Sequence, residues 1–294
     1  IDLSVLNQLS YLNLSNNLIE HFHLTSLSKI QSLDLENNFI LKNLTISNSI
    51  NKKFNLLNLN NNFRIDLSTI FIELNQIESI YIRNLKLNSI GIKHINFSAK
   101  ELDLSLINLE NFTLFQDKNL ILNKLIIQNS IINFNFSNNL YGLVEVDLSE
   151  CKLRNFDEKI IFENSNQLEI IKLRRLNLDS HFLKKFFRMP NFVRIKLIDL
   201  SENNIEYIPN EILSHNVYIK FLNLSHNYIK NYDEGNFYFS YHQSNLILDN
   251  NRLNRYIFKY LNYGHLKLSK NNISEFDFEN LFVSDILKYL ELSY

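Results

Sequence analysis

One short pattern recurs along the whole chain and constrains its fold more than any other feature. The pattern is apolar-x-apolar-x-x-Asn-x-apolar, and Leu12, Leu14, Asn17 and Ile19 form its first copy. With weaker copies included, its first apolar position recurs every 20 to 27 residues, at positions 12, 33, 57, 80, 102, 125, 146, 171, 198, 222, 246, 266 and 290. A pattern kept about thirteen times in 294 residues predicts a repeat protein, in which chain length sets the number of coils.

Elementary geometry explains the pattern. Alternating apolar residues such as Leu12 and Leu14 place both side chains on one face of a short strand. A unit of about 24 residues is too small to bury that face alone, so neighbouring coils must stack and share one core. The asparagine ends each strand, where its amide can donate to and accept from backbone groups of adjacent coils.

These residues give the chain a resemblance to leucine-rich-repeat proteins over essentially its whole length. Residues 198–213, with Ile208 and Pro209 after the asparagine position and Leu213 in the next apolar slot, resemble the typical subclass of animal extracellular proteins. Chaoptin-like adhesion proteins and Toll-like receptor ectodomains belong to that subclass. The resemblance implies an α/β solenoid, a horseshoe with a parallel inner sheet of about 13 short strands and with loops or short helices on the outer face.

The outer segments are predicted to be mixed. Residues 180–189 place Phe182, Leu183, Phe186 and Phe187 at helical spacing, with Asp179 or Ser180 as a cap, and favour a short helix. Residues 157–162 and 284–290 are weaker helix candidates. Because no linker or charge block interrupts the repeat, we expect residues 1–294 to form one solenoid that is truncated at both ends and lacks caps.

The asparagine slot is interrupted in the middle of the chain. Five successive coils carry other residues there, namely Leu85, Ile107, Ser130, Cys151 and Leu176. Loss of the shared hydrogen bonds should relax the local coil geometry. Two interpretations stay open: drift in tolerant repeats, or a distorted centre that opens a pocket. The one cysteine, Cys151, fits the slot as a small buried thiol and excludes an internal disulfide framework.

Composition excludes several function classes. The chain has 30 basic and 31 acidic residues and a net charge of −1, so no overall field recruits nucleic acid or an anionic membrane. No apolar run is long enough to span a bilayer. There is no phosphate-binding glycine-rich loop and no catalytic triad, so neither an enzyme nor a cofactor is predicted. His21 and His23 are interpreted as a surface pair in an outer loop rather than metal ligands, and no metal site is expected.

The solvent-facing residues of the inner sheet are the expected binding surface. In one coil Lys172, Arg174 and Arg175 are basic, whereas the coils on either side are acidic. Two interpretations stay open: pairing between neighbouring strands, or a charged site for a polar or acidic protein partner. The candidate ligand-binding residues are Tyr81, Arg83, Asp147, Lys172, Arg174, Arg175 and Asp199.

Seven Asn-x-Ser/Thr sequons are candidate glycosylation sites. They lie at Asn13, Asn43, Asn96, Asn111, Asn135, Asn223 and Asn272. Glycans at Asn13 and Asn223 would project from the inner sheet and obstruct a ligand there.

The resemblance implies non-catalytic recognition by part of an extracellular receptor or adhesion protein whose anchor lies outside this segment. A protein partner is expected on the inner sheet, with a lipid or glycan ligand and a homodimer left open. The alternative is an intracellular scaffold of the same fold that docks signalling or ubiquitin-ligase partners. An enzyme whose catalytic domain lies outside the segment ranks third.

Overall fold

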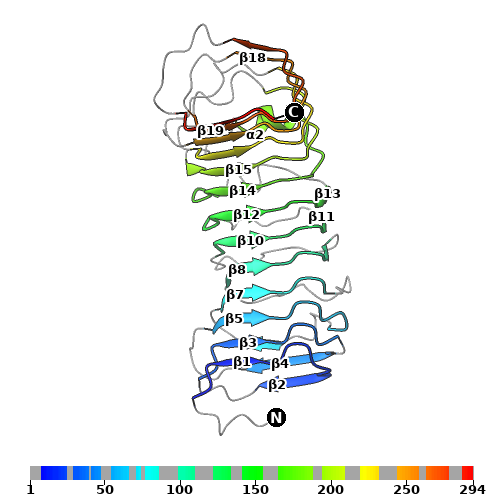
Figure 1. The fold of residues 1–294 in the computed structure, drawn as a ribbon. Coiled ribbons are helices and arrows are strands. Elements are labelled where there is room, and N and C mark those ends of the chain that lie inside the picture. Colours follow the sequence, from blue (N-terminus) through cyan, green and yellow to red (C-terminus); the bar gives the residue numbers. More distant parts are fainter. Residues whose placement is uncertain are drawn as a thin grey trace. The chain divides into compact units, whose positions relative to one another are not determined.

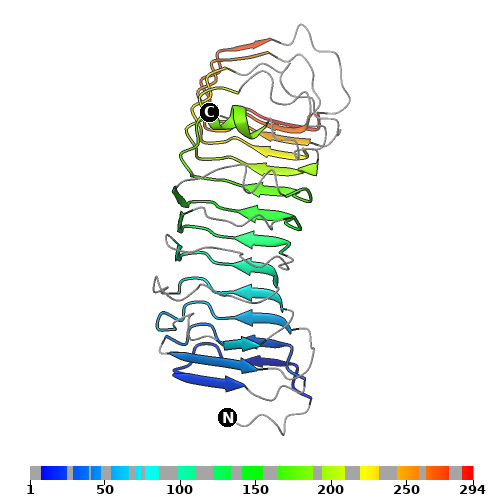
Figure 2. The same ribbon diagram turned by 180° about the vertical axis from the view of Figure 1, so that it is seen from behind.

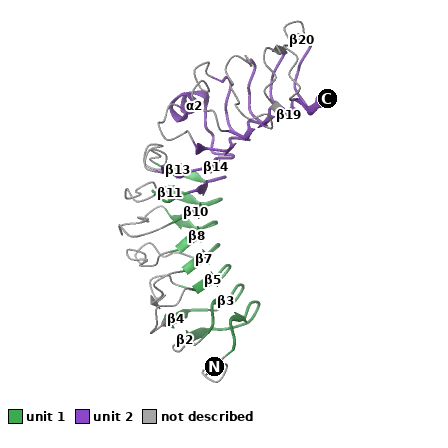
Figure 3. Cartoon of the chain, turned by 90° about the vertical axis from the view of Figure 1, so that its left-hand side faces the viewer, with its two compact units in different colours: residues 1–143, 151–164 green, residues 144–150, 165–294 purple. Residues whose placement is uncertain are grey.

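The structure of the chain is a computed structural model. It describes residues 8–24, 29–39, 41–47, 54–65, 71–73, 77–85, 99–109, 122–133, 141–154, 165–187, 194–208, 219–231, 244–257, 263–277 and 287–293. They belong to two compact units (Figure 3). Unit 1 comprises residues 1–143 and 151–164, and unit 2 comprises residues 144–150 and 165–294.

Each unit is a parallel β-solenoid, and its main sheet gains one strand per coil (Figures 1 and 2). The main-sheet strands of unit 1 are β1 (Tyr11–Asn13), β3 (Ser32–Asp34), β5 (Phe54–Asn58), β7 (Ile77–Tyr81), β8 (Ala99–Asp103) and β10 (Lys124–Ile126). Those of unit 2 are β12 (Glu145–Asp147), β14 (Ile170–Lys172), β15 (Leu197–Asp199), β16 (Phe221–Asn223), β17 (Ser244–Ile247), β19 (Tyr263–Lys267) and β21 (Tyr289–Glu291). All thirteen predicted apolar positions lie on these strands, which confirms the leucine-rich-repeat solenoid.

The apolar positions form the core of each unit. Leu33 and Leu35 in unit 1 and Leu222 and Leu224 in unit 2 are fully buried. The strands pair in register, so Leu222 lies between Ile198 and Leu246 of the adjacent strands. Each coil therefore buries its apolar face against its neighbours, as the repeat requires.

Short parallel strands also form away from the main sheet, where loops and short helices were predicted. They are β2 (His21–Leu24), β4 (Asn43–Ser47) and β6 (Phe71–Glu73), then β9 (Asn108–Leu109), β11 (Ile131–Asn133) and β13 (Lys152–Arg154), and finally β18 (Arg255–Ile257) and β20 (Glu275–Asp277). His21 and His23 lie on β2 rather than in a loop, with both side chains exposed beside the buried Phe22 and Leu24. The alternation of exposed and buried residues explains the strand.

The predicted helix is α2 (Ser180–Phe186). Asp179 is its N-cap and accepts the backbone N–H of Phe182 at 2.8 Å. Leu183 and Phe186 face the core, whereas the Ser180 hydroxyl accepts the N–H groups of Glu206 and Tyr207 at 3.0 Å from the next coil. The helix candidate at 157–162 lies outside the described residues. The candidate at 284–290 ends in strand β21, and its first residues are not described.

The asparagines of the repeat form a buried hydrogen-bond ladder. The amide nitrogen of Asn203 donates to Leu173 O of the preceding coil and to Leu200 O of its own coil, both at 2.9 Å. Its amide oxygen accepts the N–H groups of Leu176 and Leu178. Asn227, Asn251 and Asn271 repeat this arrangement. One side chain thus satisfies backbone groups of two coils, as the pattern predicted.

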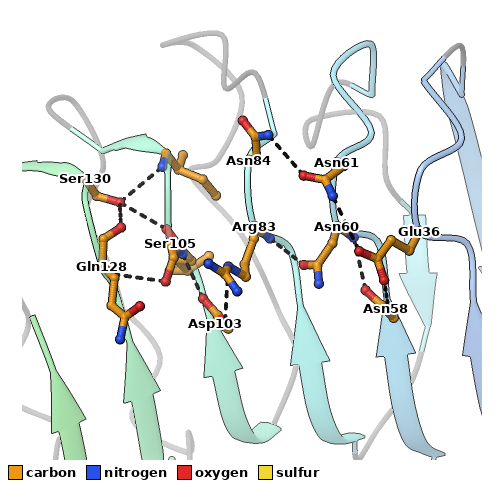
Figure 4. Close-up of polar contacts among 12 residues, drawn as sticks. Glu36, Asn58, Asn60, Asn61, Arg83, Asn84, Asp103, Ser105, Gln128 and Ser130 are labelled. Atoms are coloured by element: carbon orange, nitrogen blue, oxygen red, sulfur yellow. Dashed lines mark hydrogen bonds and ion pairs between the residues drawn. The ribbon is translucent and has the colours of Figure 1, made fainter. Parts of the chain in front are cut away.

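The ladder is interrupted less than the sequence predicted, because two of the five replacements continue it. The Ser130 hydroxyl donates to Gln128 O and accepts the N–H of Ile107 at 3.1 Å (Figure 4). The thiol of Cys151 is buried and donates to Ile127 O at 2.6 Å. Strands β7, β8 and β10 also stay in register around Leu85 and Ile107. Strand pairing is therefore retained in these coils, and a hydroxyl or thiol replaces the amide at Ser130 and Cys151. The relaxed coil geometry stays a prediction.

A second set of asparagines has a structural role that the sequence analysis missed. The residue just before the ladder position adopts a left-handed backbone conformation in twelve coils. Asparagine tolerates this region better than other non-glycine residues. Asparagine is the turn residue in six of the twelve coils, namely Asn16, Asn37, Asn61, Asn84, Asn129 and Asn250. Six of the 48 asparagines thus occupy a turn that few other residues adopt easily.

Four of these turn asparagines form a second, partly buried ladder. The amide nitrogens of Asn37, Asn61 and Asn84 each donate to the amide oxygen of the preceding member, at 2.9, 2.9 and 3.0 Å. Figure 4 shows the bond between Asn61 and Asn84. The next turn residue is Leu106, which has φ of 61° and a side chain that is 42% exposed. A leucine at this position is strained and cannot extend the amide row.

We expect Leu106→Asn to raise the free energy of unfolding by about 1 kcal/mol, because asparagine adopts the left-handed region at lower cost than leucine. Equilibrium unfolding in urea measures the change. Leu18→Asn is the control, because Leu18 is 76% exposed and lies outside the left-handed region. If both substitutions shift the transition equally, backbone strain at Leu106 is not the cause.

Candidate binding face on the main sheet

Three rows of side chains face solvent on the main sheet. We name them the leading row, just before the first apolar position of each coil; the middle row, between the two apolar positions; and the trailing row, just after the second. In the coil of β14 they are occupied by Ile170 and Lys172 on the strand and by Arg174 just after it. None of the ligand-binding residues predicted from the sequence lies in the leading row.

Acidic and amide side chains of the middle row accept a backbone hydrogen bond from the residue two positions later, where the strand ends. The carboxylate of Asp147 accepts the N–H of Ser149 at 3.0 Å, and that of Asp199 accepts the N–H of Ser201 at 3.0 Å. Asp147 is only 4% exposed. These two predicted ligand-binding residues therefore have local structural roles, which the spacing Asp-x-Ser could have indicated.

The same turn accounts for two of the seven sequons. The amide oxygens of Asn13 and Asn223 accept the N–H groups of Ser15 and Ser225, at 2.8 and 3.1 Å. Asn-x-Ser thus replaces Asp-x-Ser of other coils. Asn43 on β4 and Asn272 are exposed and lie outside this turn, whereas Asn96, Asn111 and Asn135 are outside the described residues.

The basic coil of unit 2 is paired with its neighbours. Lys172 contacts Glu145 at 2.8 Å, and Arg174 and Arg175 donate through their Nε atoms to the two oxygens of Glu202, at 2.7 and 2.8 Å. Arg175 also contacts Glu150 at 3.4 Å. The structure therefore agrees with the first interpretation of this coil, in which its charges pair with those of neighbouring coils. Binding of a partner to these charges stays a hypothesis.

Tyr81 and Arg83 lie together in unit 1, on β7 and just after it. The Tyr81 hydroxyl is 3.5 Å from Glu101, and the guanidinium of Arg83 is 3.8 Å from Asp103. The backbone N–H of Arg83 donates to Asn60 at 2.8 Å (Figure 4). The other five predicted ligand-binding residues belong to unit 2, so the seven candidates do not form one cluster within a single unit.

The leading row of unit 2 carries an apolar surface that the sequence analysis missed. Ile170, Leu197 and Phe221 are direct neighbours in the register of β14, β15 and β16. Each is half-buried on the solvent-facing side of its strand. We call these three residues the apolar row. Among the strands described, the leading row holds no other run of three adjacent apolar residues. Aligning the coils on their first apolar position would have shown these three apolar residues in the sequence.

Glu202 and Asp249 on this face have pKa values that are shifted in opposite directions. Partial burial opposes ionisation of Glu202, but hydrogen bonds and charge from Arg174 and Arg175 outweigh it and hold the pKa below its usual 4.5. At Asp249, burial raises the pKa above its usual 3.8 in spite of the hydrogen bond from the Ser269 N–H. The shifts have opposite signs because only Glu202 has two arginines beside it.

We expect the stabilising effect of Glu202 to depend on pH. Because its pKa is lowered in the folded state, its contribution is present above pH 4.5 and is lost as the pH falls below that value. Glu202→Gln should lower the free energy of unfolding by about 1 kcal/mol at neutral pH and by much less near pH 3. Urea unfolding at several pH values measures this. Glu206→Gln is the control, because the exposed pair of Glu206 with Lys230 is longer, at 3.7 Å; an equal pH dependence in both variants would refute the assignment.

The described residues contain no group of three metal-binding side chains. Within the same residues, no helix is both long and apolar enough to cross a membrane.

Comparison with known proteins identifies the fold. No protein-family model matches the chain, and no curated protein sequence matches it. A chain of the glycosylated Toll–Spatzle complex of Drosophila is similar at 18% identity and a TM-score of 0.51, covering 89% of this chain and 41% of that one. A chain of a TLR13–ssRNA13 complex is 18% identical over 99% of this chain and 50% of that one, with a TM-score of 0.49.

An internalin from Listeria monocytogenes is also similar, at 18% identity over all of this chain and 90% of that one, with a TM-score of 0.49. This chain thus spans half or less of the TLR13 and Toll–Spatzle chains that it matches. At these identities the likeness extends to the leucine-rich-repeat fold alone.

Proposed function

We propose that the chain is a non-catalytic recognition module, part of an extracellular receptor or adhesion protein of the typical leucine-rich-repeat subclass, and that it binds a protein ligand on its main sheet. The observation that carries the proposal is the apolar row. Ile170, Leu197 and Phe221 are held on three rigid strands yet face solvent, and apolar contact surrounded by charged groups is the usual anatomy of a protein interface.

Two further observations support recognition rather than chemistry. The polar groups of this face are engaged in turns and ion pairs, as in Asp199 with Ser201 and Lys172 with Glu145. The similar Toll chain is described in complex with the protein Spatzle. A protein partner also suits the net charge of −1, which provides no overall attraction for nucleic acid.

A binding screen with paired variants tests the proposal. The purified chain, made multivalent on beads, is screened against an array of extracellular protein domains. Each hit is then measured with Phe221→Asp on the main sheet and with Lys152→Glu, at an exposed residue of β13 in a separate sheet. We expect Phe221→Asp to weaken binding at least about tenfold and Lys152→Glu to leave it unchanged. Hits that respond equally to both variants, or to neither, would contradict a main-sheet interface.

The extracellular location needs its own test. The chain is expressed with a signal peptide in animal cells, and the secreted product is treated with a glycosidase. We expect a mobility shift that is reduced by Asn43→Gln and by Asn272→Gln, because both asparagines are exposed. Failure to be secreted in folded form, together with folding in the bacterial cytoplasm, would favour the intracellular scaffold instead.

A further inference from the structure

The charged side chains beside the apolar row indicate which charge its partner should carry. On the leading side of the row, the described residues provide three positive charges, Arg194, Lys196 and Lys220, and one negative charge, Glu169, which is paired with Lys196 at 2.6 Å. Lys196 and Lys220 directly precede Leu197 and Phe221 in the chain, and both are exposed. The leading rim of the apolar row is therefore basic, even though the whole chain is nearly neutral.

On the opposite side of the row, the basic side chains are paired with Glu145, Glu150 and Glu202. In the same three coils, the described residues on this side include the basic residues Lys172, Arg174 and Arg175 and the acidic residues Asp199 and Glu202. The acidic coil at β12, with Glu145 and Glu150, borders this region. Among the described residues, the leading rim therefore carries the surplus of positive charge. An apolar row beside a basic rim complements a partner with an apolar stripe and an acidic flank.

The spacing of the row indicates the conformation of that partner. Neighbouring strands lie about 4.8 Å apart, so Ile170, Leu197 and Phe221 repeat at about that interval along the solenoid. In an α-helix that lies along the same direction, side chains on one face repeat about every 5.4 Å, the length of one turn. In an extended peptide, side chains on one face repeat about every 6.7 Å. The helical repeat is the closer match.

We propose that the apolar row of unit 2 docks an acidic amphipathic α-helix of a protein partner, aligned across β14, β15 and β16. The inference rests on the proposed function and specifies its ligand. Apolar residues at i, i+4 and i+7 of the helix contact Ile170, Leu197 and Phe221, and carboxylates on one flank lie beside Arg194, Lys196 and Lys220. The ion pair of Lys196 with Glu169, at 2.6 Å, links the rim to the coil of β14.

Three designed peptides test the inference with the complete chain. The probe is a fluorescent, side-chain-stapled helix of about four turns, with leucines at i, i+4 and i+7 and glutamates on one flank. The second peptide has the same composition with the leucines spread around the helix, and the third has lysine in place of glutamate. Fluorescence anisotropy at low salt should show that the probe binds at least about tenfold more tightly than either control, and that added salt weakens it.

Protein variants locate the site. We expect Leu197→Asp to weaken binding of the probe about tenfold or more, whereas Leu56→Asp, in the same row of unit 1 on β5, leaves it unchanged. Lys196→Glu combined with Lys220→Glu should reverse the preference between the glutamate and lysine peptides. If circular dichroism shows that Leu197→Asp does not fold, Leu197→Ser replaces it.

Several results would overturn the inference: equal binding of the probe and the permuted peptide, equal effects of Leu197→Asp and Leu56→Asp, or tighter binding of a single-stranded oligonucleotide than of the probe. The proposed function has a separate readout. If the probe fails while Phe221→Asp still abolishes binding of the screened domains, only the helical partner is wrong. If those domains are insensitive as well, the main-sheet interface is wrong.

Discussion

Phe186→Ala is expected to lower the free energy of unfolding by about 3 to 5 kcal/mol. Phe186 is fully buried in α2, with its ring 5.2 Å from that of Phe182 and 5.3 Å from that of Phe187. Removing the ring leaves a cavity that neighbouring coils cannot fill without giving up their own strand pairing. Urea unfolding followed by circular dichroism measures the loss.

Phe182 provides the matched control on the same helix. It is only half-buried, so Phe182→Ala should cost clearly less than Phe186→Ala. Phe186→Leu should cost less than Phe186→Ala as well, because leucine refills part of the volume. Similar losses for Phe182→Ala and Phe186→Ala would contradict the burial of Phe186 against the coil interior.

Asn227→Ala is expected to lower the free energy of unfolding by about 3 kcal/mol. The Asn227 amide nitrogen donates to Leu200 O and Leu224 O, and its oxygen accepts the N–H of Ile205 at 3.1 Å. Alanine would leave these buried groups of two coils without a partner, and each unsatisfied group costs about 1 to 3 kcal/mol. The same urea titration measures the effect.

Two variants separate the ladder bonds from a general effect of losing asparagine. Asn17 is exposed and its amide nitrogen donates only within its own coil, so Asn17→Ala should cost less than about 1 kcal/mol. Asn227→Ser should retain part of the stability, because Ser130 holds the equivalent position in another coil with bonds to Gln128 O and from the Ile107 N–H. Equal losses for Asn17→Ala and Asn227→Ala would show that the ladder does not determine stability.

The strands were predictable because their signal is local. Leu12 and Leu14, or Leu222 and Leu224, alternate at the period of a strand, and copies at similar intervals require stacking. The helix at Ser180–Phe186 was predictable for the same reason, since its cap and its apolar spacing lie within a few residues. The outer strands were not, because short segments such as His21–Leu24 are ambiguous until a neighbouring coil pairs with them.

The candidate site was predicted less well, because its chemistry depends on contacts between coils. Arg174, Arg175 and Glu202 are unremarkable charges in the sequence until adjacent coils bring them together. Asp147 and Asp199 resembled surface ligands but are used in their own turns. The apolar row was overlooked because its three members lie 24 to 27 residues apart and gain meaning only from strand register.

The sequence by itself determined the repeat, the strand positions and the residues of the core, because apolar periodicity and the asparagine slot are properties of single coils. Only the tertiary structure decided which side chains are free to bind. Hydrogen bonds and ion pairs between coils engage Lys172, Arg174 and Arg175, and strand register gathers Ile170, Leu197 and Phe221 into one surface. Both the bonds between coils and the strand register bring together residues that are one coil apart in the chain. Neither composition nor a short motif predicts contacts over such a separation.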